Sequence, residues 1–276
     1  MVDGNRAEVG NFVEAGGVKT NYLEAGAGPP VVLVHGSGPG VTAFANWRLT
    51  IPDLAEHFHV FAPDMAGFGF SEKPGTYGMQ VWTRQIIGFL DAIGAERASL
   101  VGNSFGGGLA IRVAIEHPDR VDRLLLMGSA GVVFPITEGL DAVWGYQPGI
   151  DSMRRIMNYF AYDRSRVTDE LAEVRYRASI EPGVQEAFSA MFPAPRQRWV
   201  DGLASPEELI HAIPHEALIC HGRDDQVIPL ENAYRLHALI DRSELHVFGR
   251  CGHWTQIEWA GDFNALLTRF LSREPR

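Results

Sequence analysis

The chain has 276 residues, 46% of them hydrophobic, which is enough to bury a sizeable core in one or two domains. The charged fraction is 21%, and we find no low-complexity tract and no internal repeat, which excludes an intrinsically disordered protein. The net charge is −10, with only two lysines, Lys19 and Lys73. Because nucleic acids and anionic membranes are bound by basic surfaces, neither is an expected partner.

The sequence also gives an expectation for the compartment. No apolar run approaches the roughly 18 residues that a membrane span requires. The first residues, Met1-Val-Asp-Gly-Asn, lack the charged-then-apolar pattern of a signal peptide. Two cysteines, Cys220 and Cys251, give no disulfide framework and suit a reducing environment. We therefore expect a cytoplasmic protein without a membrane segment.

Short apolar runs alternate with longer helical patterns along the chain. Runs of four to six residues, bounded by Gly, Pro or Asp, predict buried strands at Val31–His35, Val60–Ala62, Ala98–Val101, Leu124–Met127, Ala217–Cys220 and Leu245–Phe248. Helical patterns lie near Asn46–His57, Gln80–Ile93, Phe105–His117, Glu231–Ile240 and Ala260–Leu271. This alternation predicts an α/β fold, in which helices cover both faces of a mostly parallel sheet.

The alternation fails once, between about Phe134 and Pro214, where Trp, Tyr, Met, Phe and Pro residues accumulate. Because long segments without structure of their own are uncommon, we predict an inserted helical cap. The expected divisions are residues 1–133 and 215–276 for the two parts of the core and 134–214 for the cap. The aromatic content suits a lid over an apolar pocket, although a helical extension that only adds stability is the alternative.

The strongest motif is Gly102-Asn-Ser104-Phe-Gly106, which follows a predicted strand and opens a predicted helix. In this context G-x-S-x-G predicts the nucleophile elbow of the α/β-hydrolase fold. Small residues are needed two positions before and after the serine, because side chains would collide in the tight turn. The helix N-terminus behind the serine favours developing negative charge. Ser104 is therefore the predicted nucleophile.

A serine nucleophile needs a base and a carboxylate that orients the base. In this fold the chain order is serine, acid, histidine. Asp224 and Asp225 follow one predicted strand, and His253 follows the last one, so both positions lie where ligands meet open α/β sheets. His253 is the predicted base. Of the two aspartates we prefer Asp225, although the residues alone barely separate it from Asp224.

Two backbone N–H groups should form an oxyanion hole. One is expected from Phe105, which follows the nucleophile, and the other from Ser37, with Gly38 as the alternative. The glycine-rich loop His35-Gly-Ser-Gly-Pro-Gly40 partly matches the dinucleotide-binding motif G-x-G-x-x-G, but position 41 is Val instead of the third glycine. We therefore do not expect a dinucleotide site. Neither lysine fits a P-loop, and no cluster of His or Cys suggests a metal. We expect no cofactor and no metal.

Beyond these motifs, several runs resemble one family over nearly the whole chain. They are His-Gly-Ser-Gly-Pro-Gly-Val-Thr-Ala-Phe-Ala-Asn-Trp-Arg, Gly-Asn-Ser-Phe-Gly-Gly-Gly and Gly-Arg-Cys-Gly-His-Trp-Thr-Gln-Ile-Glu. The sequence is similar to the meta-cleavage product hydrolases, which are α/β-hydrolases that hydrolyse a carbon–carbon bond in bacterial degradation of aromatic compounds. The runs from Ile136 to Tyr146 and from Met191 to Ala204 resemble its monoalkyl branch, which includes the 2-hydroxymuconate semialdehyde hydrolases.

The resemblance implies further site residues and partners. Asn46, Asn103, Arg175 and Trp254 match positions where the family contacts the dienoate end of its substrate, and Asp225 matches the triad acid. An arginine suits a carboxylate, and it provides local attraction in a protein of negative net charge. Arg175 as a surface cation and Trp254 as ordinary packing are the alternatives. The family also implies a homo-oligomer, a dimer or higher.

The implied substrate is a dienoate with a 6-oxo group, whose C5–C6 bond is hydrolysed after ketonisation. An acyl-enzyme route and a gem-diol route are both open, and so is the choice between hydrogen and methyl at C6. A carboxylesterase would use the same triad and is the main alternative. A ligand receptor that kept the hydrolase scaffold without turnover is the alternative from another class.

Overall fold

A central sheet forms the core of the structure, a computed structural model that describes residues 7–274. Its eight strands in this range lie in the order β1-β2-β4-β3-β5-β6-β7-β8. Their bounds are Asn11–Ala15 (β1), Val18–Ala25 (β2), Pro30–Val34 (β3), His59–Pro63 (β4), Ala98–Asn103 (β5), Val121–Met127 (β6), Ala217–Gly222 (β7) and Ser243–Phe248 (β8). The strands from β3 onward are parallel to one another, as predicted, and each overlaps a predicted run.

The N-terminal hairpin was missed by the sequence analysis. Strand β2 pairs antiparallel with both β1 and β4, and β1 is an edge strand with mostly exposed residues. The turn between β1 and β2 consists of Gly16 and Gly17, both with positive φ (58° and 84°). Such a two-glycine turn is a hairpin signal, so the sequence carried this information.

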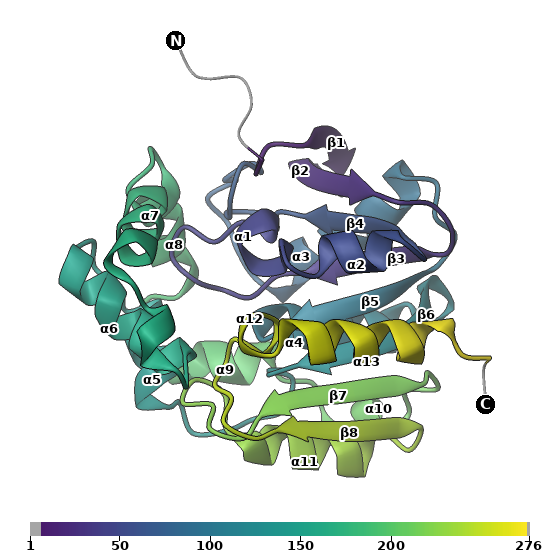
Figure 1. Cartoon of the computed structure of the whole chain (residues 1–276). Coiled ribbons are helices and arrows are strands. Elements are labelled where there is room, and N and C mark those ends of the chain that lie inside the picture. The colour runs from purple at the N-terminus through teal and green to yellow at the C-terminus, as the bar shows by residue number, and fades with distance from the viewer. Residues whose placement is uncertain (1–6, 275–276) are drawn as a thin grey trace.

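Helices cover both faces of the sheet (Figure 1). In the core they are Ala43–Trp47 (α1), Ile51–Ala55 (α2), Met79–Ala92 (α3), Phe105–Glu116 (α4), Leu230–Leu239 (α11), Thr255–Glu258 (α12) and Ala260–Ser272 (α13). Successive side chains of a strand point to opposite faces of the sheet and pack in separate core layers, as β3 shows. Val31 and Leu33 pack with Trp47 and Phe263 on the face of α1, α2 and α13, whereas Val32 packs on the other face. Burial on both faces explains the continuous apolar runs of the parallel strands.

One helix prediction was wrong in detail. The pattern near Asn46–His57 forms two short helices, α1 and α2, instead of one. Pro52 lies in the first turn of α2, where its missing N–H is tolerated, but it cannot continue a preceding helix. The helical path is therefore interrupted between Trp47 and Ile51, and Thr50 is the N-cap of α2.

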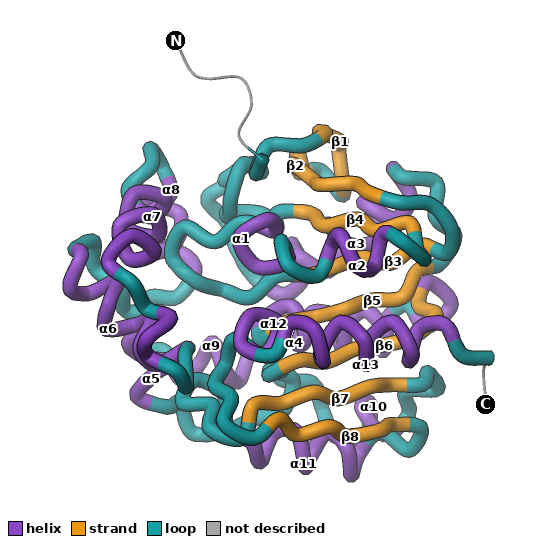
Figure 2. The backbone as a smooth tube through the Cα atoms, viewed as in Figure 1, coloured by secondary structure: helices purple, strands orange, loops and turns teal. Residues whose placement is uncertain are grey.

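Between β6 and β7 the described chain contains helices and loops but no strand (Figure 2). These elements are Glu138–Trp144 (α5), Ile150–Phe160 (α6), the 3₁₀ turn Arg164–Arg166 (η2), Asp169–Ser179 (α7), Val184–Met191 (α8), Gln197–Leu203 (α9) and Glu207–His211 (α10). In Figure 1 the arrows of the parallel strands point towards α5, α6, α7 and α8. These helices therefore face the carboxyl ends of the strands, where the predicted site residues lie.

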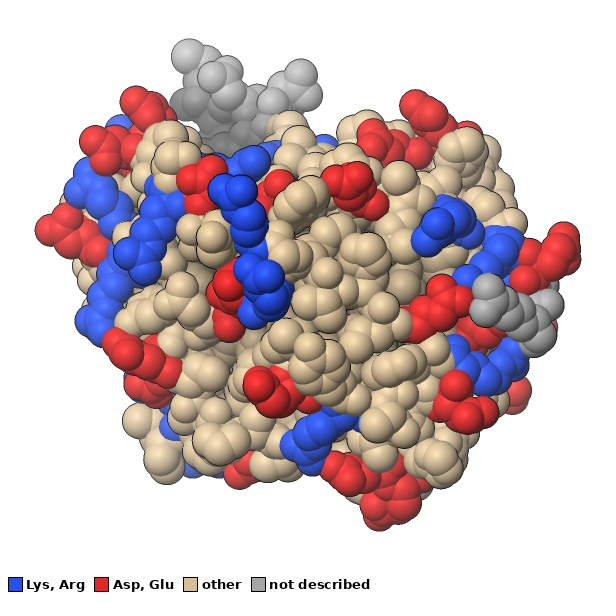
Figure 3. Space-filling view, turned by 60° about the horizontal axis from the view of Figure 1, so that its bottom comes forward, with Lys and Arg blue, Asp and Glu red and all other residues tan. Residues whose placement is uncertain are grey.

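Three further observations concern the surface charges, the helix lengths and the arrangement of possible metal ligands. On the face shown in Figure 3, acidic and basic side chains are interspersed over the side of α5–α8, and the centre carries few charges. Within residues 7–274, no helix is long and apolar enough to cross a membrane. In the same part of the chain, no group of three or more His, Cys, Asp or Glu side chains is arranged to hold a metal ion.

Candidate active site

Ser104 lies on the tight turn between β5 and α4. Its φ and ψ are 55° and −114°, a conformation that residues other than glycine seldom adopt. A Cβ on Gly102 would overlap the backbone of Gly106, and a Cβ on Gly106 would overlap the backbone of Val34. The N–H of Ser104 donates to Met127 O at 2.9 Å and fixes the turn to β6. The two glycines thus permit the close packing that presents the serine at the end of the sheet.

His253 and Asp225 form a hydrogen-bonded pair. His253 Nδ1 lies 2.7 Å from Asp225 Oδ2, and both side chains are buried. Asp225 Oδ1 accepts from the N–H groups of Val227 and Ile228 at 2.7 and 3.0 Å. Burial raises the pKa of Asp225, but the opposing charges and hydrogen bonds, of which those of His253 are the largest, together outweigh it, so the pKa lies below its ordinary value. A carboxylate here holds the Nδ1–H tautomer of His253 and leaves Nε2 able to accept a proton.

The structure distinguishes the two adjacent aspartates. The Asp224 side chain is 32% exposed and lies 3.3 Å from Arg223, whereas the Asp225 side chain is 0% exposed. Of the two, Asp225 makes the contact with His253. The geometry therefore agrees with the preference for Asp225, and its role as the triad acid stays a prediction.

His221 is a neighbour of this pair that the sequence analysis did not assign. Its ring is fully buried, and Nε2–H donates to Ile228 O at 3.0 Å while lying 3.4 Å from Asp225 Oδ2. Burial lowers the pKa of His221, which keeps the ring neutral. His221 therefore supports the loop that presents Asp225 without adding a second charge.

Glu258, also missed, fixes the loop that carries His253. Its Oε2 accepts from the N–H of Gly252 at 2.7 Å. Its Oε1 accepts from the N–H groups of Tyr162 and Asp163 at 2.9 and 3.0 Å. One carboxylate thus ties the histidine loop to the segment that follows α6. Its position five residues after His253, in the Gly-His-Trp-Thr-Gln-Ile-Glu run, is the sequence signal that could have found it.

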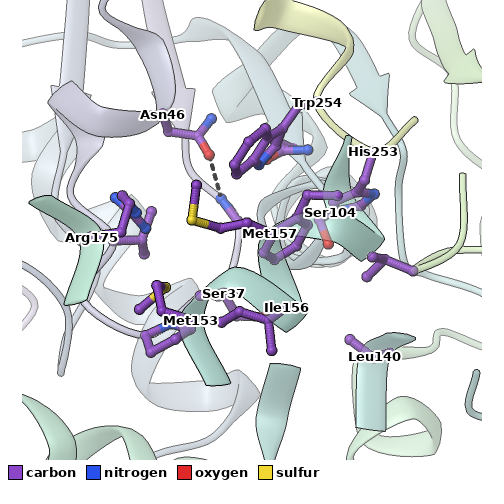
Figure 4. A pocket seen from close by; sticks show the side chains of 17 residues that line it. Ser37, Asn46, Ser104, Leu140, Met153, Ile156, Met157, Arg175, His253 and Trp254 are labelled. Atoms are coloured by element: carbon purple, nitrogen blue, oxygen red, sulfur yellow. Dashed lines mark hydrogen bonds between the residues drawn. The ribbon is translucent and has the colours of Figure 1, made fainter. Parts of the chain in front are cut away.

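A cavity is lined by most of the predicted site residues, but not by Asp225 or Phe105 (Figure 4). Ser104 and His253 lie on one side of it, and Asn46 and Arg175 lie on the other. Its apolar wall comes from α5 and α6 and includes Leu140, Met153, Ile156 and Met157. No hydrogen bond joins Ser104 to His253 among the described residues, and such contacts are often long before substrate binds. The structure therefore brings residues of the core and of the α5–α7 segment around one space.

The predicted dienoate contacts all line this cavity. Asn103 Nδ2 donates to Met127 O at 3.3 Å, which fixes its side chain next to the elbow. Asn46 Oδ1 accepts from the N–H of Gly36 at 3.4 Å, and its Nδ2 is buried without a partner among the described residues. Trp254 stacks on Phe160 with ring centroids 5.2 Å apart. Asn46 therefore offers a free donor, whereas Trp254 packs on the end of α6.

Arg175 extends from α7 to the cavity wall. Its Nη2 lies 4.0 Å from the place that a Cβ on Gly38 would take, beside the loop after β3. No hydrogen bond or ion pair to another described residue holds the guanidinium. Burial lowers the pKa of Arg175 to about 10, with the charge of Glu8 opposing the shift, so the group is cationic at neutral pH. An inward-facing cation without a fixed partner is suited to an anionic ligand.

The predicted oxyanion donors lie at two places around Ser104. Phe105 is the first residue of α4, so its N–H has no acceptor within the helix. Ser37 and Gly38 both line the cavity, and Trp144 Nε1 donates to Ser37 Oγ at 2.9 Å. This bond anchors the loop to α5. The choice between Ser37 and Gly38, and the oxyanion role itself, stay predictions.

His35 anchors the start of the same loop. Its Nε2 accepts from the N–H of Met65 at 2.9 Å, so Nδ1 carries the proton and donates to Gly36 O at 2.8 Å. The side chain is fully buried, and burial lowers the pKa of His35 to about 4. The hydrogen bond to Gly36 opposes this shift, and the charge of Arg175 adds to it.

This burial predicts acid sensitivity. Because the unfolded chain binds a proton near pH 6.5 and the folded chain only near pH 4, His35 stabilises the fold above pH 6.5 and loses that contribution as the pH falls towards 4. At pH 5 the loss is about 2 kcal/mol of unfolding free energy. Urea unfolding of the wild type and of His35→Asn at pH 7.5 and pH 5 measures it. The difference in unfolding free energy between the two proteins should be smaller at pH 5 than at pH 7.5 by that amount. An equal difference at both pH values would contradict the lowered pKa of His35.

Comparison with known proteins places these features in context. Residues 29–260 match the family described as alpha/beta hydrolase fold. The sequence is 60% identical to a 2-hydroxymuconate semialdehyde hydrolase of Pseudomonas sp. (strain CF600), over 97% of this chain and 95% of that protein. It is also 60% identical to a 2-hydroxy-6-oxo-2,4-heptadienoate hydrolase of Pseudomonas putida, over 97% of this chain and 98% of that protein. A solved meta-cleavage product hydrolase from Pseudomonas fluorescens superposes with a TM-score of 0.95 at 58% identity, covering 96% of this chain and 98% of that one.

Proposed function

Since the chain belongs to the meta-cleavage product hydrolases of the α/β-hydrolase fold, we propose that it hydrolyses the C5–C6 bond of 2-hydroxy-6-oxohexa-2,4-dienoate or its 6-methyl analogue. The products are 2-hydroxypenta-2,4-dienoate and formate or acetate. The observation that carries this proposal is one cavity with Ser104 and His253 on one side and the unpaired cation of Arg175 on the other. A dienoate has a carboxylate at one end, which suits Arg175, and a 6-oxo group at the other end, which suits Ser104 and His253.

The first step is ketonisation. Direct cleavage of C5–C6 would expel an unstabilised carbanion, so C5 is protonated first and a 2-oxo group forms in conjugation with C3–C4. Arg175 and the free Nδ2 of Asn46 hold the carboxylate end while this proton moves. The departing carbon then leaves as a dienolate, in which the charge is delocalised.

The second step is hydrolysis at C6. His253 accepts a proton through Nε2 from Ser104 or from a water molecule, which attacks the C6 carbonyl. The N–H groups of Phe105 and of Ser37 or Gly38 stabilise the oxyanion. Asp225 stabilises the imidazolium through the 2.7 Å hydrogen bond to Nδ1. Collapse of the intermediate breaks C5–C6, and addition of one water gives the two products by either the acyl-enzyme or the gem-diol route.

The apolar wall of the cavity supports a hydrogen or an apolar substituent at C6. Leu140, Ile156 and Val227 line the cavity together with the catalytic pair. A methyl group in an apolar pocket contributes only about 1–3 kcal/mol, so the aldehyde and the methyl ketone should both be hydrolysed. Values of kcat/KM for the aldehyde, methyl-ketone and phenyl-ketone ring-fission products measure this preference.

Replacing Arg175 by glutamine tests the carboxylate site. Loss of a charge-assisted contact of about 1.5–3 kcal/mol should lower kcat/KM for the dienoate roughly 10–100-fold, mainly through KM. Hydrolysis of a neutral aryl ester should change little, because it has no carboxylate to bind. Arg177→Gln is the matched control, since Arg177 lies on the same helix and pairs with Glu173 at the surface. Equal losses on both substrates would argue against the assigned role.

The same two substrates test the function itself. A meta-cleavage product hydrolase removes the dienolate absorbance with many turnovers and hydrolyses a simple aryl ester more slowly. A carboxylesterase would show the reverse order, and a receptor on this scaffold would bind the dienoate without repeated turnover. Decay of the dienolate absorbance under substrate excess is therefore the decisive measurement.

The proposal extends to the organisation of the protein. We place the cap at residues 134–214 between core segments 1–133 and 215–276, and we propose a cytoplasmic homo-oligomer that acts without a cofactor. The free, buried thiols of Cys220 and Cys251 support a reducing compartment. Light scattering coupled to size-exclusion chromatography measures the assembly state.

A further inference from the structure

A second hollow lies behind Arg175, between α1 and α7. The side chains of Leu49 and Val174 border it and are 42% and 62% exposed, so it opens to solvent. It shares four wall residues with the catalytic cavity, namely Val41, Asn46, Arg175 and Trp254. We call this hollow the α1–α7 groove. Only a shared wall of side chains separates it from the space beside Ser104.

The α1–α7 groove carries positive charge in a protein of net charge −10. Arg48, Arg166 and Arg175 line it together with one carboxylate, Glu8. Arg166 also pairs with Asp163 at 3.8 Å, so Arg48 and Arg175 supply the excess positive charge. Arg48 Nη1 donates a hydrogen bond to Ala45 O at 2.6 Å, and the other nitrogens of its guanidinium make no hydrogen bond to the described residues. A cleft lined by one sign of charge attracts opposite charge locally, even when the net charge repels it.

Another hollow near the triad has the opposite character. It lies outside the loops after β7 and β8, and four of its residues carry carboxylates: Asp163, Asp224, Asp225 and Glu258. Three arginines, Arg164, Arg166 and Arg250, accompany them. This hollow shares no wall residue with the catalytic cavity. Because its carboxylates outnumber its arginines and it does not adjoin the catalytic cavity, this hollow is a poorer route for an anion than the α1–α7 groove.

We propose that the α1–α7 groove is the route by which the anionic substrate reaches and leaves the catalytic cavity. Arg48 captures the carboxylate at the mouth, and Arg175 receives it at the shared wall. Because Arg175 borders both spaces and has no fixed partner, its side chain can swing to admit the ligand. This inference rests on the proposed function, since it takes the dienoate as the ligand.

A bulky residue at the mouth tests the route. In the Ser104→Ala background, stopped-flow absorbance with 2-hydroxy-6-oxohexa-2,4-dienoate gives the association and dissociation rate constants. Val174→Trp should lower both by roughly 10-fold and leave Kd within about twofold, because an obstructed path changes rates without changing the bound state. Ile180→Trp is the matched control, since Ile180 follows α7, is 47% exposed and does not line the groove.

The charge at the mouth gives an independent readout. Arg48→Gln in the same background should lower the association rate constant roughly 3–10-fold at low ionic strength, with a weaker salt dependence than the parent. The dissociation rate constant should change much less. Unchanged association in both Val174→Trp and Arg48→Gln, with tight dienoate binding retained, would overturn the route while leaving the proposed function intact. Absence of dienoate binding to a Ser104→Ala parent that circular dichroism and thermal unfolding show to be intact would overturn both.

Discussion

Replacing Ser104 by alanine is expected to lower dienoate turnover at least about a hundredfold while leaving dienoate binding intact. The hydroxyl lies at the strained turn between β5 and α4, where it lines the cavity with His253. Alanine keeps the backbone and the packing but removes the group that attacks or positions the attacking water. Stopped-flow decay of the dienolate absorbance measures turnover, and titration of the same absorbance measures Kd.

The neighbouring strand offers a control for this substitution. Ser99 lies on β5, the strand that leads into Ser104, is buried, and does not line the cavity. Ser99→Ala should therefore retain turnover close to that of the wild type. Near-normal turnover in Ser104→Ala would refute the role of this serine. Loss of both turnover and binding would point to a damaged elbow, which circular dichroism and thermal unfolding would reveal.

The second large effect is expected at Asp225. Asp225→Asn should lower kcat on the order of 10⁴-fold, because an amide at this place favours the wrong tautomer of His253 and cannot stabilise the imidazolium. Asp224→Asn should stay within about threefold of wild type, because a surface ion pair of this kind contributes little. Steady-state kinetics on the dienoate measure both variants.

The adjacent pair makes this comparison informative. Both variants remove one negative charge within two neighbouring positions, so a general effect of net charge would appear equally in both. Similar losses of kcat in the two variants would contradict the assignment of Asp225 as the triad acid. A larger loss in Asp224→Asn would move the acid to the exposed position, in conflict with the hydrogen bond that Asp225 makes to His253.

Local chemistry made much of the fold and part of the site predictable. The elbow motif spans five residues, and the clash that requires Gly102 arises with the backbone of Gly106 four residues later. The clash that requires Gly106 arises with the backbone of Val34 on β3, so this glycine depends on how α4 packs against the sheet. The parallel strands were found because burial on both faces leaves continuous apolar runs. The hairpin of β1 and β2 was missed because β1 is an exposed edge strand. Its turn, Gly16-Gly17, was the available signal.

Other features depend on contacts between distant segments. Glu258 binds N–H groups of Tyr162 and Asp163, which lie 96 and 95 residues away in the chain. The run around His253 includes Glu258, but no local pattern indicates which backbone groups its carboxylate binds. Arg175 was assigned by resemblance alone, since a cation on a helix with Arg177 nearby reads equally well as a surface residue. Its place across the cavity from Ser104 (Figure 4) follows from the position of α7 beyond the carboxyl ends of the parallel strands (Figure 1).

The sequence by itself determined the tight turn at Ser104 and the break in the β–α alternation that marks the helices between β6 and β7. These depend on backbone sterics and on periodic burial, which act over a few residues. Only the tertiary structure decided that Asp225 and not Asp224 meets His253, and that the α1–α7 groove adjoins the cavity. Two adjacent side chains of the same chemistry differ only in direction, and a cavity exists only once remote segments have packed around it.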